Sequence, residues 1–363
     1  MLTLAKDLKI IIKEAIIYYV WAFLKKQKIA CHITGGNMLN KIAENIYCKE
    51  VPLPNNPLRH INVYIIKGED DRGLIIDTGF NRPECEAALQ EAFDELGIES
   101  PDVFITHLHS DHVGLVPKFA GEGSTIYASE IDGEIINFEV GNLYWYILDD
   151  MFIKYGFPPA DFGRNTDIHP GRKYVHESRI DFHYVEDGDV LEYGGYKLEV
   201  VATPGHTPGL VGLYDREHKI YFCGDHILGT ITPNITIEIS ADNPLADYLK
   251  SLEKVEKLEV EKLLTAHGTP VPDMYERIDE LKKHHEARLA EVQKILGDEW
   301  KTAFECARDM TWEIECRNWD EFPAPQKWFA TGEAISHLQY LYSVGRVERD
   351  ELEGDIYYYR NKK

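Results

Sequence analysis

The sequence predicts a mixed α/β sandwich with a large buried core. Short β-branched runs alternate with segments of helical spacing, and tight polar turns join several neighbouring runs. Alternating strands and helices favour an α/β fold, while the hairpins favour a mixed sheet over a purely parallel one. The composition, with 44% hydrophobic and 28% charged residues over 363 positions, is ordinary for a folded domain of this size.

The predicted strands are short apolar runs that end at turns. Residues 61–66 and 74–76 flank the polar turn 67–73 and form a predicted hairpin. Further strands are expected at 103–106, 125–128, 181–185, 197–202, 210–214, 220–223 and 262–265. Residues 83–96 have helical spacing, with an early proline and a glycine just past the end. Further helices are expected near 112–119, 243–258 and 272–296.

Changes in composition predict the domain organisation. Residues 38–300 form the predicted main domain, and its aromatic, strand-poor insertion at 130–180 is either a lid or binding element or a packed structural excursion. Residues 301–363 show the pattern helix, helix and hairpin, with a helix at 330–344, and resemble a winged-helix-like module. Its hairpin is acidic and rich in tyrosine, which favours packing or homodimer formation over DNA binding.

Residues 1–37 differ from the remainder in charge. Six lysines against one aspartate and one glutamate give +4, and since the formal net charge is -23, the remainder carries -27. The apolar run 15–24 is shorter than the about 20 residues of a membrane span, and no signal cleavage site follows it. An amphipathic surface helix is one alternative. A second hypothesis is that these residues are an upstream extension and that translation of a bacterial gene begins at Met38; N-terminal sequencing of the native protein tests it, and a chain beginning at Met1 would end the idea.

The net charge predicts which partners are disfavoured, and the cysteine spacing predicts the cellular compartment. An acidic surface repels phosphate backbones, so nucleic acid is a disfavoured partner. None of the six cysteines stands in a C-x-x-C pair or at zinc-finger spacing. We therefore expect reduced thiols and a cytoplasmic protein.

The strongest chemical signal is the stretch 106–114, THLHSDHVG. On an extended backbone His107 and His109 project to the same side, so their imidazoles can converge on one ion. Asp111 and His112 are neighbours on the following turn and diverge from that pair, so they can reach a second ion nearby. The pattern H-x-H-x-D-H therefore predicts two adjacent metal sites.

Three other segments complete the two predicted coordination shells. TPGHTPG at 203–209, YFCGDH at 221–226 and LTAHG at 264–268 each place one ligand type just after a predicted strand. These ligands are His206, Asp225 and His267. Strand ends deliver loop residues to one rim of a sheet, so the segments are expected to meet the first motif there.

With these motifs, residues 38–290 resemble the metallo-β-lactamase fold superfamily, in its glyoxalase-II-like, two-metal branch. The resemblance implies an αββα sandwich with both metals at one edge. It also implies that the first metal is held by His107, His109 and His206 and the second by Asp111, His112 and His267. Asp225 would bridge both metals, and Asp77 in IIDTG would steady the ligand loop.

Some residues of this chain depart from the family pattern, and these departures narrow the range of expected activities. Members that hydrolyse β-lactams use a cysteine at one second-metal position or lack the bridging aspartate, whereas here Asp225 holds that place and Cys223 lies two residues earlier. Histidine at position 109, in place of glutamate, argues against the di-iron oxygen-reducing relatives, and no glutathione-contacting residue can be matched. The stretch 224–235, GDHILGTITPNI, and the winged-helix-like module together resemble a bacterial subgroup of lactamase-like hydrolases, some relatives of which cleave RNA.

Two adjacent divalent ions would lower the pKa of water from 15.7 to about 7, so a hydroxide held between them is the predicted nucleophile. Asp111 or Asp225 would pass a proton to the leaving group. Nitrogen and oxygen ligands favour Zn²⁺, with Fe²⁺ or Mn²⁺ as alternatives.

The leading prediction is a hydrolase of an ester-like acyl bond, such as a thioester or lactone, in a small-molecule substrate. Arg164, Arg172 and Lys173 are candidates to meet an anionic tail, or else are solvated surface charges. A phosphodiesterase or ribonuclease on the same metals is the second hypothesis, and a metal-bound, non-catalytic binding protein is the third.

Overall fold

The computed structural model describes residues 39–69, 71–160, 170–174, 176, 178–314, 316–352 and 355–362. Residues from Leu39 onward belong to one compact unit. The predictions for residues 1–37, including a start of translation at Met38, lie outside the described residues. Among the residues that are described, none of the helices combines the length and the apolar character needed to cross a membrane.

The first of the two large sheets has seven strands in the order of the sequence. Its first four strands pair antiparallel and the rest parallel. They are β1 (Asn40–Ala43), β2 (Ile46–Pro52), β3 (His60–Lys67), β4 (Gly73–Ile76), β5 (Asp102–Phe104), β6 (Ile126–Ser129) and β7 (His183–Val185). The predicted hairpin is the antiparallel pair β3 and β4, as expected.

The second sheet has five strands in the order β12-β11-β10-β9-β8, antiparallel except for the parallel pair β11 and β12. These are β8 (Val190–Tyr193), β9 (Tyr196–Ala202), β10 (Val211–Asp215), β11 (Ile220–Gly224) and β12 (Lys262–Thr265). Both sheets therefore combine antiparallel and parallel strand pairs, which confirms the prediction of a mixed α/β fold.

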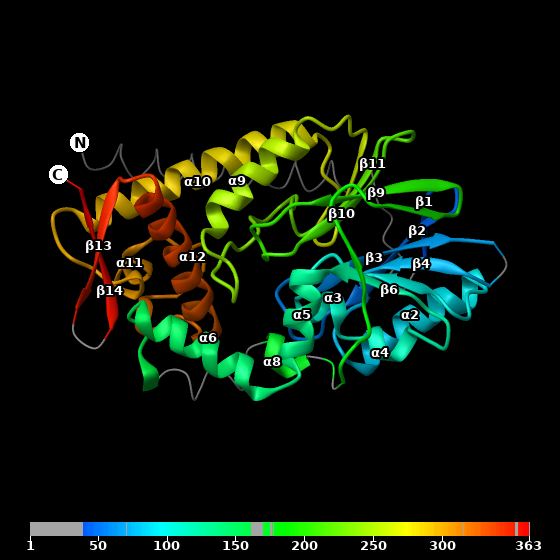
Figure 1. Cartoon of the computed structure of the whole chain (residues 1–363), viewed down its shortest axis with the longest axis horizontal. Helices are drawn as coiled ribbons and strands as arrows, with labels where there is room; N and C mark the ends of the chain where they lie inside the picture. Colours follow the sequence, from blue (N-terminus) through cyan, green and yellow to red (C-terminus); the bar gives the residue numbers. More distant parts are fainter. Residues whose placement is uncertain are drawn as a thin grey trace, which may run out of the picture. The chain divides into compact units, whose positions relative to one another are not determined.

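Alternation along the strands builds two apolar layers. In β3, Tyr64 and Ile66 pack between the two sheets, whereas Ile61, Val63 and Ile65 pack on the opposite face. Figure 1 shows α2 (Pro83–Leu96) and α4 (Val116–Phe119) outside the first sheet, and α9 (Pro244–Val255) and α10 (Met274–Leu296) outside the second. The chain therefore forms the expected αββα sandwich.

Most predicted bounds agree with the structure to within three residues. The predicted helix at 112–119 is wrong in one respect: it is two short helices, α3 (Ser110–Val113) and α4. Pro117 separates them because it has no N–H to donate to the preceding turn. The sequence analysis missed β1, β2 and β8, since polar residues such as Lys49 and Glu50 interrupt the apolar runs there.

The described part of the 130–180 segment is helical and packs against the C-terminal residues. It contains α5 (Glu130–Glu139), α6 (Asn142–Lys154) and α8 (Pro170–Tyr174). The C-terminal elements are α11 (Ala303–Asp309), the 3-10 helix η1 (Trp319–Glu321), α12 (Ala324–Ser343), β13 (Val347–Leu352) and β14 (Ile356–Asn361). Phe152 of α6 stacks on Trp328 of α12 with ring centroids 4.3 Å apart. The division into a main domain and a winged-helix-like module stays a prediction.

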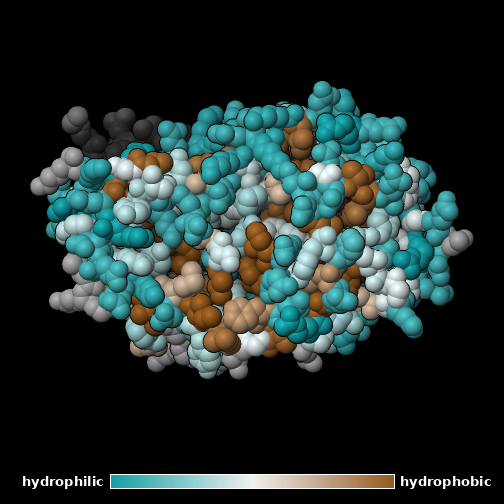
Figure 2. All heavy atoms as spheres, viewed as in Figure 1, coloured by the Kyte–Doolittle hydropathy of each residue, from teal (hydrophilic) through white to brown (hydrophobic). Residues whose placement is uncertain are grey.

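One face of the molecule carries a concentration of apolar side chains. Figure 2 shows them gathered over α6 and α8 and between α12 and α5. Exposed large apolar residues of α6 include Leu143, Tyr146 and Ile147. This face lies beside the cavity described below.

Candidate metal centre

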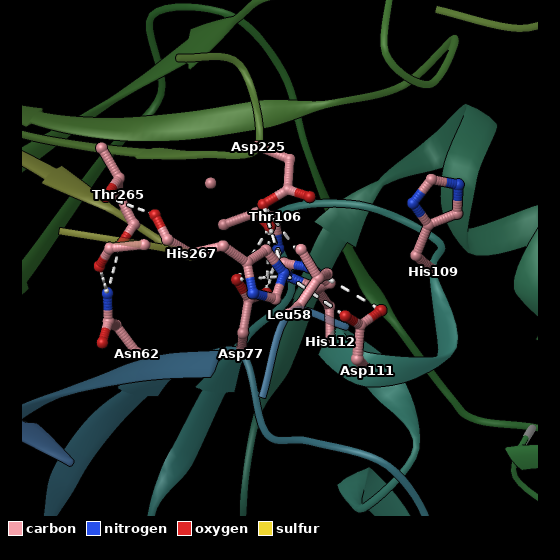
Figure 3. Close-up of polar contacts among 12 residues, drawn as sticks. Leu58, Asn62, Asp77, Thr106, His109, Asp111, His112, Asp225, Thr265 and His267 are labelled. Carbon is pink, nitrogen blue, oxygen red and sulfur yellow. Dashed lines mark hydrogen bonds and ion pairs between the residues drawn. The ribbon is translucent and has the colours of Figure 1, made fainter. Parts of the chain in front are cut away.

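The predicted ligands meet at one edge of the sandwich, just past the carboxyl ends of strands. His107 and His109 follow β5, His206 follows β9, Asp225 follows β11 and His267 follows β12. The other two, Asp111 and His112, lie on α3 (Figure 3). Four separate segments of the chain thus supply the seven side chains that the sequence singled out.

Three histidines form the first candidate group. His107 Nε2 and His206 Nε2 each lie 3.1 Å from His109 Nδ1. Nitrogens bound tetrahedrally to one zinc ion, 2.0–2.1 Å from it, are about 3.3 Å apart. The spacing of the three imidazoles therefore fits one ion, and His109 and His206 also line the cavity described below.

The second candidate group contains Asp111, His112 and His267. His267 Nε2 lies 3.3 Å from Asp111 Oδ2, and His112 Nε2 lies 4.0 Å from Asp111 Oδ1. Asp225 stands between the two groups. Its Oδ2 is 3.6 Å from His206 Nε2, while its Oδ1 is 3.7 Å from His112 Nε2 and 3.6 Å from His267 Nε2. One carboxylate thus faces both groups.

Unsatisfied buried atoms support a cation at this position. Within the described part of the chain, His112 Nε2, His267 Nε2 and Asp225 Oδ1 are buried and have no hydrogen-bond partner. Such atoms cost free energy unless a ligand satisfies them. Two imidazole nitrogens and a carboxylate oxygen that converge in this way fit the donor set of a divalent metal.

The electrostatics differ between the two groups. Burial lowers the pKa of His107 well below its ordinary value, and the neighbouring His112 lowers it further. Burial also acts to lower the pKa of His267, but the carboxylates of Asp225 and Asp111 raise it to about 10. His107 is therefore neutral, whereas positive charge on His267 is balanced by two carboxylates.

Hydrogen bonds behind the ligands orient the rings. The Nδ1–H group of His112 donates to Asp77 Oδ2 at 2.8 Å, and Asp77 also accepts from the backbone N–H of Thr106 at 2.9 Å. His206 Nδ1–H donates to the Asn234 carbonyl at 2.8 Å, and His267 Nδ1–H donates to the His60 carbonyl at 3.1 Å. Each bond leaves Nε2 as the free ligand atom. The role of Asp77 in steadying the ligand loop stays a prediction, which these hydrogen bonds support.

Asp132, at the start of α5, is a further functional candidate that the sequence analysis missed. Its carboxylate accepts hydrogen bonds from Leu108 N at 3.0 Å, Thr207 Oγ1 at 2.6 Å and Gly209 N at 2.7 Å. It therefore ties the loop of His107 and His109 to the loop of His206. Burial raises the pKa of Asp132 to about 6 although these hydrogen bonds lower it. In the sequence, Asp132 is only an acidic residue in the first turn of a helix. Such residues are common because they favour the helix N-terminus, so the sequence pattern does not indicate this role.

A cavity of about 230 Å³ opens from the candidate metal groups. His109, Asp111, His206 and Asp225 line one part of it. Much of the remaining wall is apolar and includes Phe80, Leu108, Tyr144, Trp145, Trp328 and Phe329. The 130–180 segment and α12 thus both contribute to the wall.

The cations predicted to meet an anionic tail are not among the described residues that line this cavity. Lys173 Nζ lies over the ring of Tyr174, 5.2 Å from its centroid. Burial raises the pKa of Asp149 to about 6, although the nearby Arg172 acts to lower it. Arg164 lies outside the described residues.

Comparison with known proteins gives the family. Residues 56–267 match the Metallo-beta-lactamase superfamily. The Beta-lactamase-like protein 2 homolog of Caenorhabditis elegans is 28% identical over 68% of this chain and 70% of its own length. The Acyl-coenzyme A thioesterase MBLAC2 of Gallus gallus is 28% identical over 57% of this chain and 72% of its own. The crystal structure of a metallo-beta-lactamase family protein from Thermus thermophilus superposes on this chain with a TM-score of 0.75 and 29% sequence identity. The superposition covers 89% of this chain and 100% of the other. The chain belongs to the metallo-beta-lactamase superfamily, as a hydrolase with a cluster of histidines and aspartates that could hold metal.

Proposed function

We propose that this protein hydrolyses ester-like acyl bonds, with thioesters as the first substrate class and lactones as the second. The observation that carries the proposal is the shared cavity: four of the predicted ligands and a largely apolar, aromatic wall line the same space. Such a space suits an acyl chain whose scissile carbonyl lies at the ligands. The 28% identity to an acyl-coenzyme A thioesterase supports this choice.

The proposed cofactor is a pair of divalent ions, with Zn²⁺ preferred and Fe²⁺ or Mn²⁺ as alternatives. His107, His109 and His206 would hold one ion, Asp111, His112 and His267 the other, and Asp225 would contact both. Ions at these positions supply activated water near neutral pH and polarise the acyl carbonyl. The protein is proposed to act on a small molecule in the cytoplasm.

The chain's own residues perform three tasks in this reaction. The apolar wall positions the acyl chain and excludes water, which strengthens the electrostatic interactions in the site. Asp77 and the two backbone carbonyls hold the imidazoles in fixed orientations. Asp111 and Asp225 line the cavity, so either carboxylate can hold or pass the proton that the leaving group needs.

An assay on defined substrates tests the proposal. Protein loaded with zinc, manganese or iron is supplied with acyl-coenzyme A thioesters, lactones and bis-p-nitrophenyl phosphate. We expect turnover of a thioester or lactone and a loss of at least about 100-fold in His109→Ala, since the first candidate group loses a ligand. His183→Ala, which removes an exposed histidine of β7, is the matched control and should keep full activity.

The other outcomes select the other hypotheses. Activity on the phosphodiester alone would replace the proposal with a phosphodiesterase or ribonuclease. No turnover of any substrate by protein that has bound metal would favour a non-catalytic binding protein.

A further inference from the structure

The cavity contains two buried carboxyl groups that the proposed hydrolysis does not use. Glu139 ends α5 and Glu238 lies in the extended segment 233–238, and their exposed fractions are 5% and 4%. Both line the cavity that the candidate ligands line. Tyr144 Oη donates to Glu238 Oε2 at 2.6 Å.

The segment 233–238 presents polar groups to the cavity in alternation. Asn234, Thr236 and Glu238 line the cavity, while Ile235 and Ile237 are buried in the core on the other side. Thr236 is 4% exposed, and within the part of the chain described, neither its Oγ1 nor Asn234 Oδ1 has a hydrogen-bond partner. Buried polar atoms without partners are rare in folded proteins, so these two indicate a ligand group that belongs here.

Two acidic side chains meet aromatic rings in this region. No lysine or arginine is found among the described residues that line the cavity. Burial raises the pKa of Glu238 to about 7 and that of Glu139 well above its ordinary value, and each is affected by further acidic neighbours. The rings of Tyr144, Trp145, Trp328 and Phe329 face the same space. Carboxylates combined with aromatic rings are the surroundings that organic cations prefer.

We propose that this acidic and aromatic part of the cavity binds an ammonium group of the substrate, so that the preferred substrate is an acyl compound whose chain carries an amine. The scissile bond would lie at the candidate metal ligands and the ammonium group at Glu139 and Glu238. This inference rests on the proposed function for its acyl bond, but the ammonium site can be tested without turnover.

The binding test compares hexylammonium with 1-hexanol, which has a chain of the same length and no charge. Calorimetry on the metal-loaded protein should show hexylammonium binding at least about tenfold more tightly. Glu139→Gln and Glu238→Gln should each reduce this preference, and the double variant should remove it. Glu130→Gln, which changes an exposed acid on the same helix outside this cavity, should leave it unchanged. Equal affinity for the two probes, or a preference that survives the double variant, would overturn the proposal.

A turnover test uses thioesters of ω-amino acids and their isosteres that end in methyl, over a range of chain lengths, with the uncatalysed rate subtracted. We expect the ratio of kcat/KM to favour the ammonium compound by about tenfold and to fall toward one in Glu238→Gln. The ratio is insensitive to a partly unfolded preparation, because both substrates meet the same active fraction. Turnover of the methyl-terminated series without an ammonium preference would refute this inference and keep the proposed function. Glu238-dependent binding of hexylammonium without any acyl turnover would support the ammonium site and refute the proposed function.

Discussion

At the scale of single residues, Asp132 connects two loops that carry candidate ligands without being a candidate ligand itself. In Asp132→Asn, an amide NH₂ would face backbone N–H donors or the Thr207 hydroxyl, so one or more of the three hydrogen bonds would be lost. We expect a 10–100-fold loss of metal affinity. Chelator competition on the folded protein measures it, with the exposed Glu134→Gln of the same helix as control. Unchanged affinity would show that Asp132 stabilises the fold only.

The raised pKa of Glu238 should make the free energy of unfolding depend on pH. Its folded pKa of about 7 lies above the ordinary value of 4.5, so its protonated form stabilises the fold at low pH and this stability is lost as the pH rises through about 7. The wild type should therefore lose up to about 3 kcal/mol of unfolding free energy relative to Glu238→Gln between pH 4.5 and 8. Urea unfolding of both proteins at several pH values measures this difference. A difference that is flat with pH, as expected for the Glu130→Gln control, would contradict it.

At the scale of elements, the packing of α12 against the cavity wall depends on Gly332. A Cβ atom at this position would overlap Thr236 Oγ1 and lie 3.3 Å from Phe152 Cζ. In Gly332→Ala, this overpacking costs about 1–3 kcal/mol and the better helix propensity of alanine returns up to about 1 kcal/mol. We expect a net loss of about 1–2 kcal/mol in urea unfolding and a lower kcat/KM, because α12 also carries Trp328 of the wall.

Gly141→Ala is the control for that substitution. The nearest atom to its added Cβ is Phe138 O at 3.8 Å, so the change should stay within about 0.5 kcal/mol. A more stable Gly332→Ala protein would mean that α12 does not approach the 233–238 segment this closely.

The elements that sequence patterns predicted well are those whose signals are local. The helix α2 matches its predicted bounds because proline near its start and Gly97 after its end define both termini. The missed strands β1 and β8 are short and partly exposed, so they lack a clear apolar pattern. Their strand conformation depends on pairing with β2 and β9, the strands that follow them. The start of α12 was placed at residue 330 but lies at Ala324, since Pro323 and Pro325 are tolerated in a first turn and do not end the helix.

At the scale of the whole molecule, folding should be linked to metal binding. In the described structure, buried His112 Nε2, His267 Nε2 and Asp225 Oδ1 have no hydrogen-bond partner, so an ion that satisfies them stabilises the native state. At a free metal concentration of 100 times Kd the gain is about 2.7 kcal/mol. A chelator should therefore lower the Tm, and zinc, manganese or iron should restore it in the order of affinity. A Tm that is the same with and without chelator would contradict metal binding at this site.

The sequence by itself determined the mixed α/β class and seven candidate ligands, because strand periodicity and the H-x-H-x-D-H spacing are local properties of the chain. The αββα arrangement and the role of Asp77 came from the resemblance to the metallo-β-lactamase superfamily. Only the tertiary structure decided what surrounds them. Asp132, Glu139 and Glu238 have no distinguishing pattern in the sequence, and they acquire their roles because folding buries them beside loops that are distant along the chain. Burial raises the pKa of Asp132 to about 6 and that of Glu238 to about 7, and this burial is a consequence of packing that no local pattern records.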